Sequence, residues 1–360
     1  MRYKGKDKRR DRRRNRKMIL LGLCGLSCFL AIICLAGIFR LRADLRKLHS
    51  QLGWNGECMA ADLAAGEDGI TDVSGERAGE AAPDRTKAQD PAEDTGADYP
   101  DRWGLDNVDS PRQRTEKEVL DRLRELGEDS ELIADILQNR SDYPKKLLEA
   151  LANNPEMADF VSGWHGPEET AEGGLTESEK EQDFPLFLQW DPRWGYVEYG
   201  DDSCIGLAGC GPACLSMALY YLTGDESLTP DRVGDYSMEN GCYISGVGTA
   251  WVLMEVMPLE YGIGVRQPAI SLEEMEKALN GGDVIILSMG PGDFTAAGHF
   301  IVVYGYDEDG FMVNDPNCVA RSRRRWSFSE IEGQIKHMWV LSKDMTPIYY
   351  GGVITDYAEE

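Results

Sequence analysis

Cys210 stands in the run Gly209-Cys210-Gly211-Pro212, a setting that suits a nucleophilic thiol. The flanking glycines leave the backbone open around the sulfur, and proline is tolerated in the first turn of a helix. The apolar residues that follow keep helical spacing, so Cys210 is expected at a helix N-terminus. There the helix dipole and the free N–H groups favour the thiolate, which can attack a carbonyl carbon. A buried structural cysteine is the alternative that this local context leaves open.

His299 and Asp315 are the residues that could complete such a site. His299 follows three small residues and precedes residues 300–303, an apolar run that predicts a strand. Asp315 lies just beyond the run 311–313, and a hairpin turn at 307–310 would make the two strands neighbours. A carboxylate in that place could hold one imidazole nitrogen and fix the tautomer. The alternatives are a histidine that caps a strand edge and an aspartate that serves only as a turn residue.

Together the three residues follow the order of the papain-like constellation: cysteine at a helix start, histidine at a strand start, carboxylate after the next strand. The motifs that carry a wider resemblance are Gln189-Trp190-Asp191-Pro192-Arg193-Trp194-Gly195, Tyr199-Gly200, Gly209-Cys210-Gly211-Pro212, Gly298-His299-Phe300 and Asn314-Asp315-Pro316. From about Asp183 to Lys343 the chain resembles the papain-like cysteine peptidases of family thirty-nine, in the extracellular branch related to bacteriocin-processing peptidase domains. The resemblance implies that Cys210, His299 and Asp315 are nucleophile, base and orienting residue, and that Gln189 takes the oxyanion role.

Two positions depart from this pattern. Gln189 lies 21 residues before Cys210, whereas many papain-like enzymes have only a few residues between them. Its assignment therefore follows the longer-gap branch, although a side-chain amide and the Cys210 N–H could together hold a developing oxyanion. Gly209 stands where the bacteriocin-processing members usually have Asp, so their double-glycine leader specificity is not implied.

The predicted fold class is α+β, because helical patterns come first and strand patterns later. The domain at residues 183–345 has helical patterns from Cys210, after Thr229-Pro230, near 247–257 and after a capping box at Ser271 and Glu274. Strand patterns follow, at 284–287, 300–303, 311–313 and 338–341.

A helical segment at residues 115–165 precedes this domain. It opens with a capping box formed by Thr115 and Glu118, and Gly127 is interpreted as the end of the first helix. Three further short helices are predicted, the last from Pro155 through Phe160. Such helices are too short to stand alone, so they should pack together or on the following domain. The segment from Tyr143 to Val161 resembles the helical lead-in of such peptidases in Gram-positive bacteria.

The N-terminal residues predict a membrane anchor. Residues 1–17 hold eleven Lys or Arg and two Asp, and residues 18–39 contain neither charge nor proline. Twenty-two helical residues span roughly 33 Å, the thickness of a bilayer core. A cleaved signal peptide is the alternative, but no clean cleavage site follows. The positive-inside rule then places a basic tail in the cytoplasm and the rest outside, which makes the chain a single-pass protein of the cell membrane with an extracellular catalytic domain.

The remaining segments are acidic. The net charge of the chain is −25 despite its basic start, so nucleic acid is not expected as a ligand. Residues 40–114 are interpreted as a disordered acidic stalk, 166–182 as an acidic linker and 346–360 as a tail.

The remaining cysteines and a group of arginines could have other roles. Of nine cysteines, six lie outside residues 18–39 and could form up to three disulfides, but a catalytic Cys210 would leave at least one unpaired. There is no C-x-x-C pair and no phosphate-loop signature, so neither metal nor cofactor is expected. Arg321, Arg323, Arg324 and Arg325 could bind an acidic polymer, but a solvated loop is the preferred interpretation.

The leading hypothesis is therefore a membrane-anchored, extracytoplasmic cysteine peptidase that acts on peptides or proteins. A cell-wall amidase or endopeptidase that uses the same dyad is the second, and a cell-wall peptide would then be the substrate. A degenerate peptidase domain that serves as a binding module is the third, and the intact Cys210, His299 and Asp315 argue against it.

Overall fold

The structure is a computed structural model that describes residues 108–200 and 203–343. The predicted basic tail at 1–17, the membrane span at 18–39, most of the stalk at 40–114 and the tail at 346–360 lie outside the described residues. Within the described ranges, no helix is both long and apolar enough to cross a membrane.

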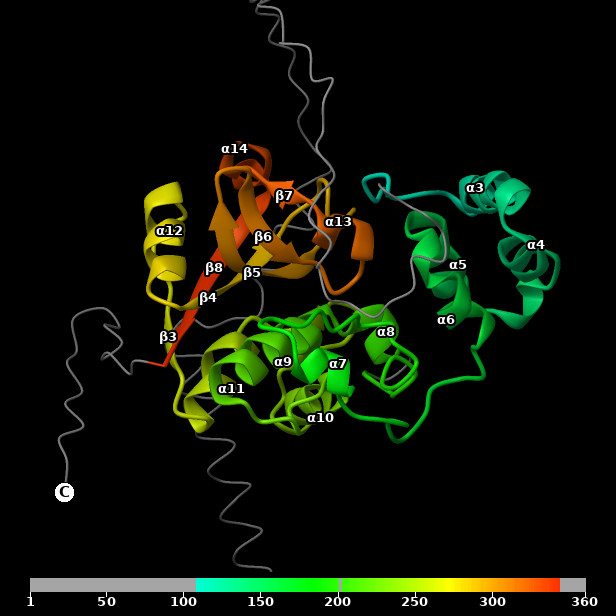
Figure 1. The fold of residues 1–360 in the computed structure, drawn as a ribbon. Helices are drawn as coiled ribbons and strands as arrows, with labels where there is room; N and C mark the ends of the chain where they lie inside the picture. Colours follow the sequence, from blue (N-terminus) through cyan, green and yellow to red (C-terminus); the bar gives the residue numbers. More distant parts are fainter. Residues whose placement is uncertain (1–107, 201–202, 344–360) are drawn as a thin grey trace, which may run out of the picture. The chain divides into compact units, whose positions relative to one another are not determined.

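The helical segment comes first among the described residues and consists of short helices (Figure 1). Its elements are α3 (Glu116–Asp129), α4 (Glu131–Gln138), η2 (Arg140–Asp142), α5 (Lys145–Asn153), η3 (Pro155–Met157) and α6 (Ala158–Ser162). The capping box of Thr115 and Glu118 is confirmed. Gly127 does not end α3, which continues to Asp129; a Cβ at Gly127 would lie 3.3 Å from the backbone of Ala134, so glycine allows α3 and α4 to pack closely there.

The domain that follows begins with helices. They are α7 (Glu177–Lys180), α8 (Ile205–Ala208), α9 (Cys210–Thr223), α10 (Pro230–Glu239), α11 (Leu253–Glu260) and α12 (Leu272–Asn280). A small hairpin of β1 (Tyr243–Ile244) and β2 (Gly248–Thr249) precedes α11, so the helix predicted near 247–257 begins later than expected. The acidic segment 166–182 contains α7, whose buried Glu179 pairs with Arg193 of the domain at 2.6 Å.

One antiparallel sheet of six strands dominates the rest of the described chain. The remaining elements are β3 (Gly264–Arg266), β4 (Val284–Met289), β5 (His299–Asp307), β6 (Gly310–Asn314), α13 (Val319–Arg323), β7 (Arg325–Trp326), α14 (Phe328–Ile331), η4 (Glu332–Gln334) and β8 (Ile335–Ser342). The order across the sheet is β3-β8-β4-β5-β6-β7. The predicted strands and the hairpin between β5 and β6 are confirmed, as is the α+β class.

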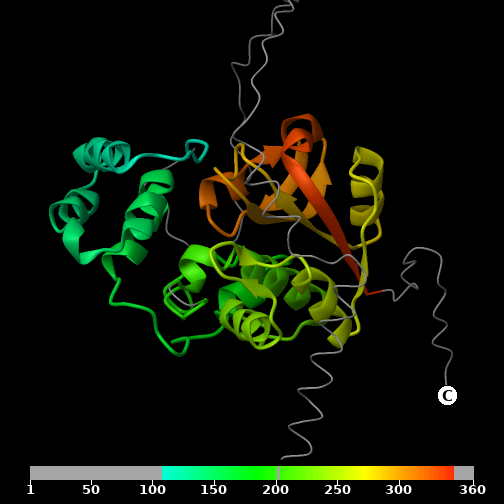
Figure 2. The ribbon, with the colours of Figure 1, turned by 180° about the vertical axis from the view of Figure 1, so that it is seen from behind.

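Alternation along the strands gives the sheet two buried faces. One face, with Ile286, Val302 and Trp339, packs against α9, and the other, with Ile285 and Val303, packs beneath α12. In the view from behind, Figure 2 shows α12 on one side of the sheet and helices α9–α11 on another. Because helix α9 is buried along nearly its whole length, its first residue is held firmly against the sheet.

The helical segment shares the core of the α9 face. A single hydrophobic cluster contains Leu123, Ile136 and Phe160 together with residues of α9 and the sheet. The ring of Phe160 stacks on Tyr196 with 4.6 Å between centroids, and the Tyr196 hydroxyl donates to the Phe160 carbonyl at 2.9 Å. The expectation that these helices pack on the following domain is confirmed.

Candidate active site

Cys210 is the first residue of α9, as the sequence predicts. Glycine stands on either side of Cys210 because there is no room for a side chain, and not because the backbone angles there are unusual. A Cβ at Gly209 would lie 2.5 Å from the Ile205 carbonyl oxygen, and one at Gly211 would lie 2.7 Å from the side chain of Thr249. The turn from α8 into α9 is therefore tightly packed by the β1–β2 hairpin, and Cys210 is held at the start of a buried helix.

Among the five described cysteines, all of which are free, Cys210 differs from the others in exposure. Cys210 is half-buried, whereas the other four are buried. Burial raises the pKa of the Cys204 thiol to about 11, and it raises the pKa values of Cys214, Cys242 and Cys318 as well. These four thiols therefore resist ionisation, which makes them poor nucleophiles.

His299 and Asp315 meet as the hairpin geometry predicts. His299 opens β5, and Asp315 directly follows β6. The His299 Nε2 lies 2.7 Å from Asp315 Oδ1, and both side chains are buried. Burial lowers the pKa of His299, but the Asp315 carboxylate and hydrogen bonds to Asp315 and Cys210 outweigh it and raise the pKa from 6.5 to about 9. Since Nε2 faces the carboxylate, Nδ1 is the nitrogen left for the thiol.

The other carboxylate oxygen of Asp315 accepts from Arg321, which the sequence predicts in a solvated loop. Arg321 does not lie in a solvated loop: it is 2% exposed and its Nε donates to Asp315 Oδ2 at 2.6 Å. Burial would raise the pKa of Asp315, but Arg321, and then His299, lower it from 3.8 to about 2. Asp315 therefore stays ionised down to about pH 2.

The predicted arginine cluster is dispersed by the fold. Arg324 stacks over Trp326 and pairs with Glu330, and Arg325 pairs with Asp307. Arg321, the first arginine of the run, reaches the site because α13 turns it inward. Nothing in the local sequence separates Arg321 from its neighbours. A signal would have been its position six residues after Asp315, across the turn at Pro316 and Asn317.

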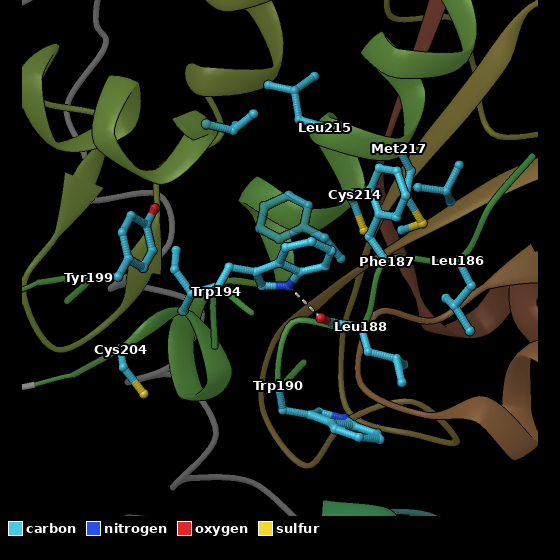
Figure 3. Packing of buried hydrophobic residues seen from close by; sticks show 14 of the residues in the cluster. Leu186, Phe187, Leu188, Trp190, Trp194, Tyr199, Cys204, Cys214, Leu215 and Met217 are labelled. Carbon is cyan, nitrogen blue, oxygen red and sulfur yellow. Dashed lines mark hydrogen bonds between the residues drawn. The ribbon is translucent and has the colours of Figure 1, made fainter. Parts of the chain in front are cut away.

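Gln189 forms hydrogen bonds with both α8, which precedes Cys210, and the turn that follows Asp315. Its Nε2 donates to the Gly206 carbonyl in α8 at 2.9 Å, and its backbone N donates to Pro316 O at 2.7 Å. It is 5% exposed, and its Oε1 has no partner within the described residues. The residues on either side of Gln189 are anchored in the core, where Trp194 Nε1 donates to the Leu188 carbonyl at 2.8 Å (Figure 3). The side chain is thus fixed beside the turn that leads into Cys210.

A protein family accounts for these features. Residues 181–345 match the model of the Peptidase_C39 like family. This part of the chain therefore has the sequence pattern of that family. The peptidase domain therefore contains the whole constellation of Cys210, His299, Asp315 and Gln189, whereas the helical segment lies outside the matched residues.

Two solved structures are similar to the peptidase domain. The peptidase domain of Streptococcus ComA, a bi-functional ABC transporter involved in a quorum sensing pathway, is 17% identical, with a TM-score of 0.30. The comparison covers 38% of this chain and 91% of that one. A putative C39-like peptidase from Bacillus anthracis is 15% identical, with a TM-score of 0.31, over 45% of this chain and 96% of that one. No curated protein matches the sequence, so the family assignment rests on residues 181–345.

Proposed function

We propose that this protein is a cysteine peptidase that hydrolyses peptide bonds through a thioester intermediate. Cys210 is the nucleophile, His299 the base and Asp315 the residue that orients the imidazole. The observation that carries the proposal is the buried pair of His299 Nε2 and Asp315 Oδ1 at 2.7 Å, with Cys210, the first residue of α9, near enough to raise the pKa of the same imidazole.

We infer that the reacting form of the site pairs a thiolate at Cys210 with an imidazolium at His299. The raised pKa of His299 keeps its ring protonated up to about pH 9, and the positive ring together with the α9 N-terminus stabilises negative charge on the sulfur. Asp315 fixes the ring by holding Nε2–H, so the proton on Nδ1 faces the reacting atoms.

The reaction needs only these groups and water. Cys210 Sγ attacks the carbonyl carbon of the scissile bond, and the carbonyl becomes an oxyanion. Collapse breaks the C–N bond, and the amine leaves with the proton from His299 Nδ1. His299 then takes a proton from water, the hydroxide attacks the thioester carbon, and the C–S bond breaks to release the acid. The thiolate and the imidazolium are restored.

Gln189 is proposed as the side-chain donor to the oxyanion, together with the Cys210 backbone N–H. One of its two amide protons is used by Gly206, so the other is free to face a developing negative charge. Gly206 lies four residues before Cys210 in the same tight turn, which supports this role.

The chain is further proposed to be anchored in the cell membrane by residues 18–39, with the peptidase domain outside. The support is the uncharged run that follows eleven basic residues. Protease treatment of intact cells should remove the peptidase domain and spare the basic tail. Resistance of the domain until the cells are lysed would refute this orientation.

The test of catalysis uses the full-length protein, iodoacetamide and fluorescently labelled casein. Cys210 is expected to be alkylated faster than Cys204, Cys214 and Cys318, as mapped by mass spectrometry, and Cys210→Ala should abolish casein cleavage while circular dichroism stays unchanged. Cys242→Ala, which removes a buried thiol, is the matched control and should retain both. If all thiols react equally and casein is not cleaved, the proposal is refuted and the binding-module hypothesis is favoured. If peptidoglycan fragments are cleaved but casein is not, the cell-wall amidase or endopeptidase is favoured.

A further inference from the structure

A carboxylate from outside the peptidase domain caps the helix that supports the active site. Glu156 lies in η3 of the helical segment, beyond the residues that match the family. Its Oε2 accepts from the Val319 backbone N at 2.7 Å, and its Oε1 accepts from the Ala320 N at 2.9 Å. These are the first two residues of α13, whose N–H groups would otherwise have no partner within the helix.

Helix α13 is the element that presents Arg321 to Asp315. It has five residues, too few for a helix to persist without tertiary contacts. Besides the Arg321 Nε bond at 2.6 Å, α13 contributes Ser322, whose hydroxyl accepts from the Asp315 backbone N at 2.8 Å. Both the side chain and the backbone of Asp315 are therefore held by α13, and Asp315 in turn holds His299.

Two other contacts from the N-terminal side converge on the same turn. Asn154 Nδ2 donates to the Asn317 carbonyl, and the Asn317 backbone N donates to Asp315 Oδ1 at 2.8 Å. Val108 is buried in a small cluster with Cys318 and Ala320, so the end of the predicted disordered stalk packs on α13. Burial removes the apolar side chain of Val108 from solvent, and this favours packing of the last stalk residues on the domain.

The position of Arg321 is unfavourable without such support. Its guanidinium is buried, yet within the described residues its Nη1 and Nη2 have no hydrogen-bond partner. Burying donors of a charged group without acceptors opposes folding of this turn. Contacts that fix α13 from outside are needed to keep Arg321 on Asp315 rather than in solvent.

We propose that Glu156 is a positioning residue of the active site, and that the helical segment acts through it to keep Asp315 aligned with His299. The inference rests on the proposed peptidase function. It makes the segment at residues 115–165 a working part of the enzyme rather than a spacer between the membrane and the peptidase domain. A Glu156 that merely stabilised the fold would change the melting temperature but not the protonation of His299.

The charge on His299 can be read without a known substrate. Iodoacetate and iodoacetamide alkylate the same thiolate, but only iodoacetate carries a negative charge, so the ratio of their rates at Cys210 rises when the neighbouring imidazole is positive. In the full-length wild type the ratio should fall as pH rises through about 9, where His299 loses its proton.

The experiment compares Glu156→Ala and Glu156→Gln with the wild type. The alanine variant loses both acceptors, so the pH at which the ratio falls should move down by about one unit, and kcat/KM on labelled casein should drop about tenfold or more. The glutamine variant keeps one acceptor oxygen and should lie between the two. Glu149→Gln, an exposed carboxylate on α5, is the matched control and should match the wild type.

Circular dichroism and thermal melting establish which variants are folded. If Glu156→Ala does not fold, the comparison is made with Glu156→Gln. A folded Glu156 variant with the wild-type pH profile and the wild-type kcat/KM would overturn the proposal. Failure of the peptidase function is a distinct result: the wild type itself would then show neither casein cleavage nor preferential alkylation of Cys210.

Discussion

Replacing Asp315 by Asn removes the negative charge that holds His299 and leaves the size of the side chain unchanged. In the wild type the carboxylate accepts from His299 Nε2 at 2.7 Å, from Asn317 N at 2.8 Å and from Arg321 Nε at 2.6 Å. An amide has one oxygen and one NH₂ group, so at least one of these three donors would face a donor. The charge on Arg321 would also lose its only buried counter-ion within the described residues.

The expected loss of kcat/KM in Asp315→Asn follows from the protonation of His299. Its pKa rises from 6.5 to about 9, with Asp315 as the largest raising influence, and at about 1.36 kcal/mol per pKa unit this corresponds to roughly 3.4 kcal/mol. Without the carboxylate, burial lowers the pKa of His299, and Cys210 is the influence that remains to raise it. Asp315→Asn should therefore lower kcat/KM by at least roughly tenfold, and toward about 300-fold if the whole stabilisation of the imidazolium is lost.

The assay is cleavage of labelled casein, with the ratio of iodoacetate to iodoacetamide alkylation at Cys210 as the readout of charge. His299→Ala should be at least as damaging as Asp315→Asn, and the double variant should be little worse than His299→Ala, because the two residues act as a unit. Asp309→Asn, in the exposed turn between β5 and β6, is the control. A folded Asp315→Asn protein with wild-type turnover would remove Asp315 from the mechanism and leave a dyad.

Three further outcomes are expected. Gln189→Ala should lower kcat by about 10²-fold yet leave the alkylation rate of the nucleophile unchanged, because oxyanion donors act on acyl transfer; an unaltered kcat would exclude the role. Phe160→Ala, which empties a fully buried position, should cost about 3–5 kcal/mol in urea unfolding, and a cost below about 1 kcal/mol would contradict a shared core. The raised pKa of His299 should add folding stability that is fully present below pH 6.5 and is lost as the pH rises through about 9. The lowered pKa of Asp315 should add folding stability that is lost only as the pH falls through about 2. The urea midpoint should thus decline between pH 6.5 and 9 in the wild type but not in His299→Ala.

Local patterns predicted most of the elements that position the site. The start of α9 at Cys210, the hairpin that brings His299 beside Asp315 and the capping box of α3 all depend on residues within a few positions of one another. Spacing, capping and turn chemistry act over that distance, so they can be read from the sequence. The roles of the four site residues came instead from the resemblance to a family.

Long-range packing decided what those patterns missed. The sequence predicts a helix end at Gly127, but its lack of a side chain serves the approach of Ala134. The sequence also predicts one solvated run of arginines, although a helix of five residues turns Arg321 into the core and leaves Arg324 outside. In both cases the partner lies on a separate element, so no periodicity could reveal it.

The sequence by itself therefore determined the α+β class, the order of the elements and the cysteine, histidine and aspartate available for chemistry. The tertiary structure alone decided that Asp315 is held from both sides, by His299 and by Arg321, and that Glu156 of the helical segment caps the helix that carries Arg321. The physical reason is that a charge can be buried only where its partners converge. Arg321 and His299 are 6 and 16 residues from Asp315, and Glu156 is 163 residues from Val319, so only the fold brings these groups together.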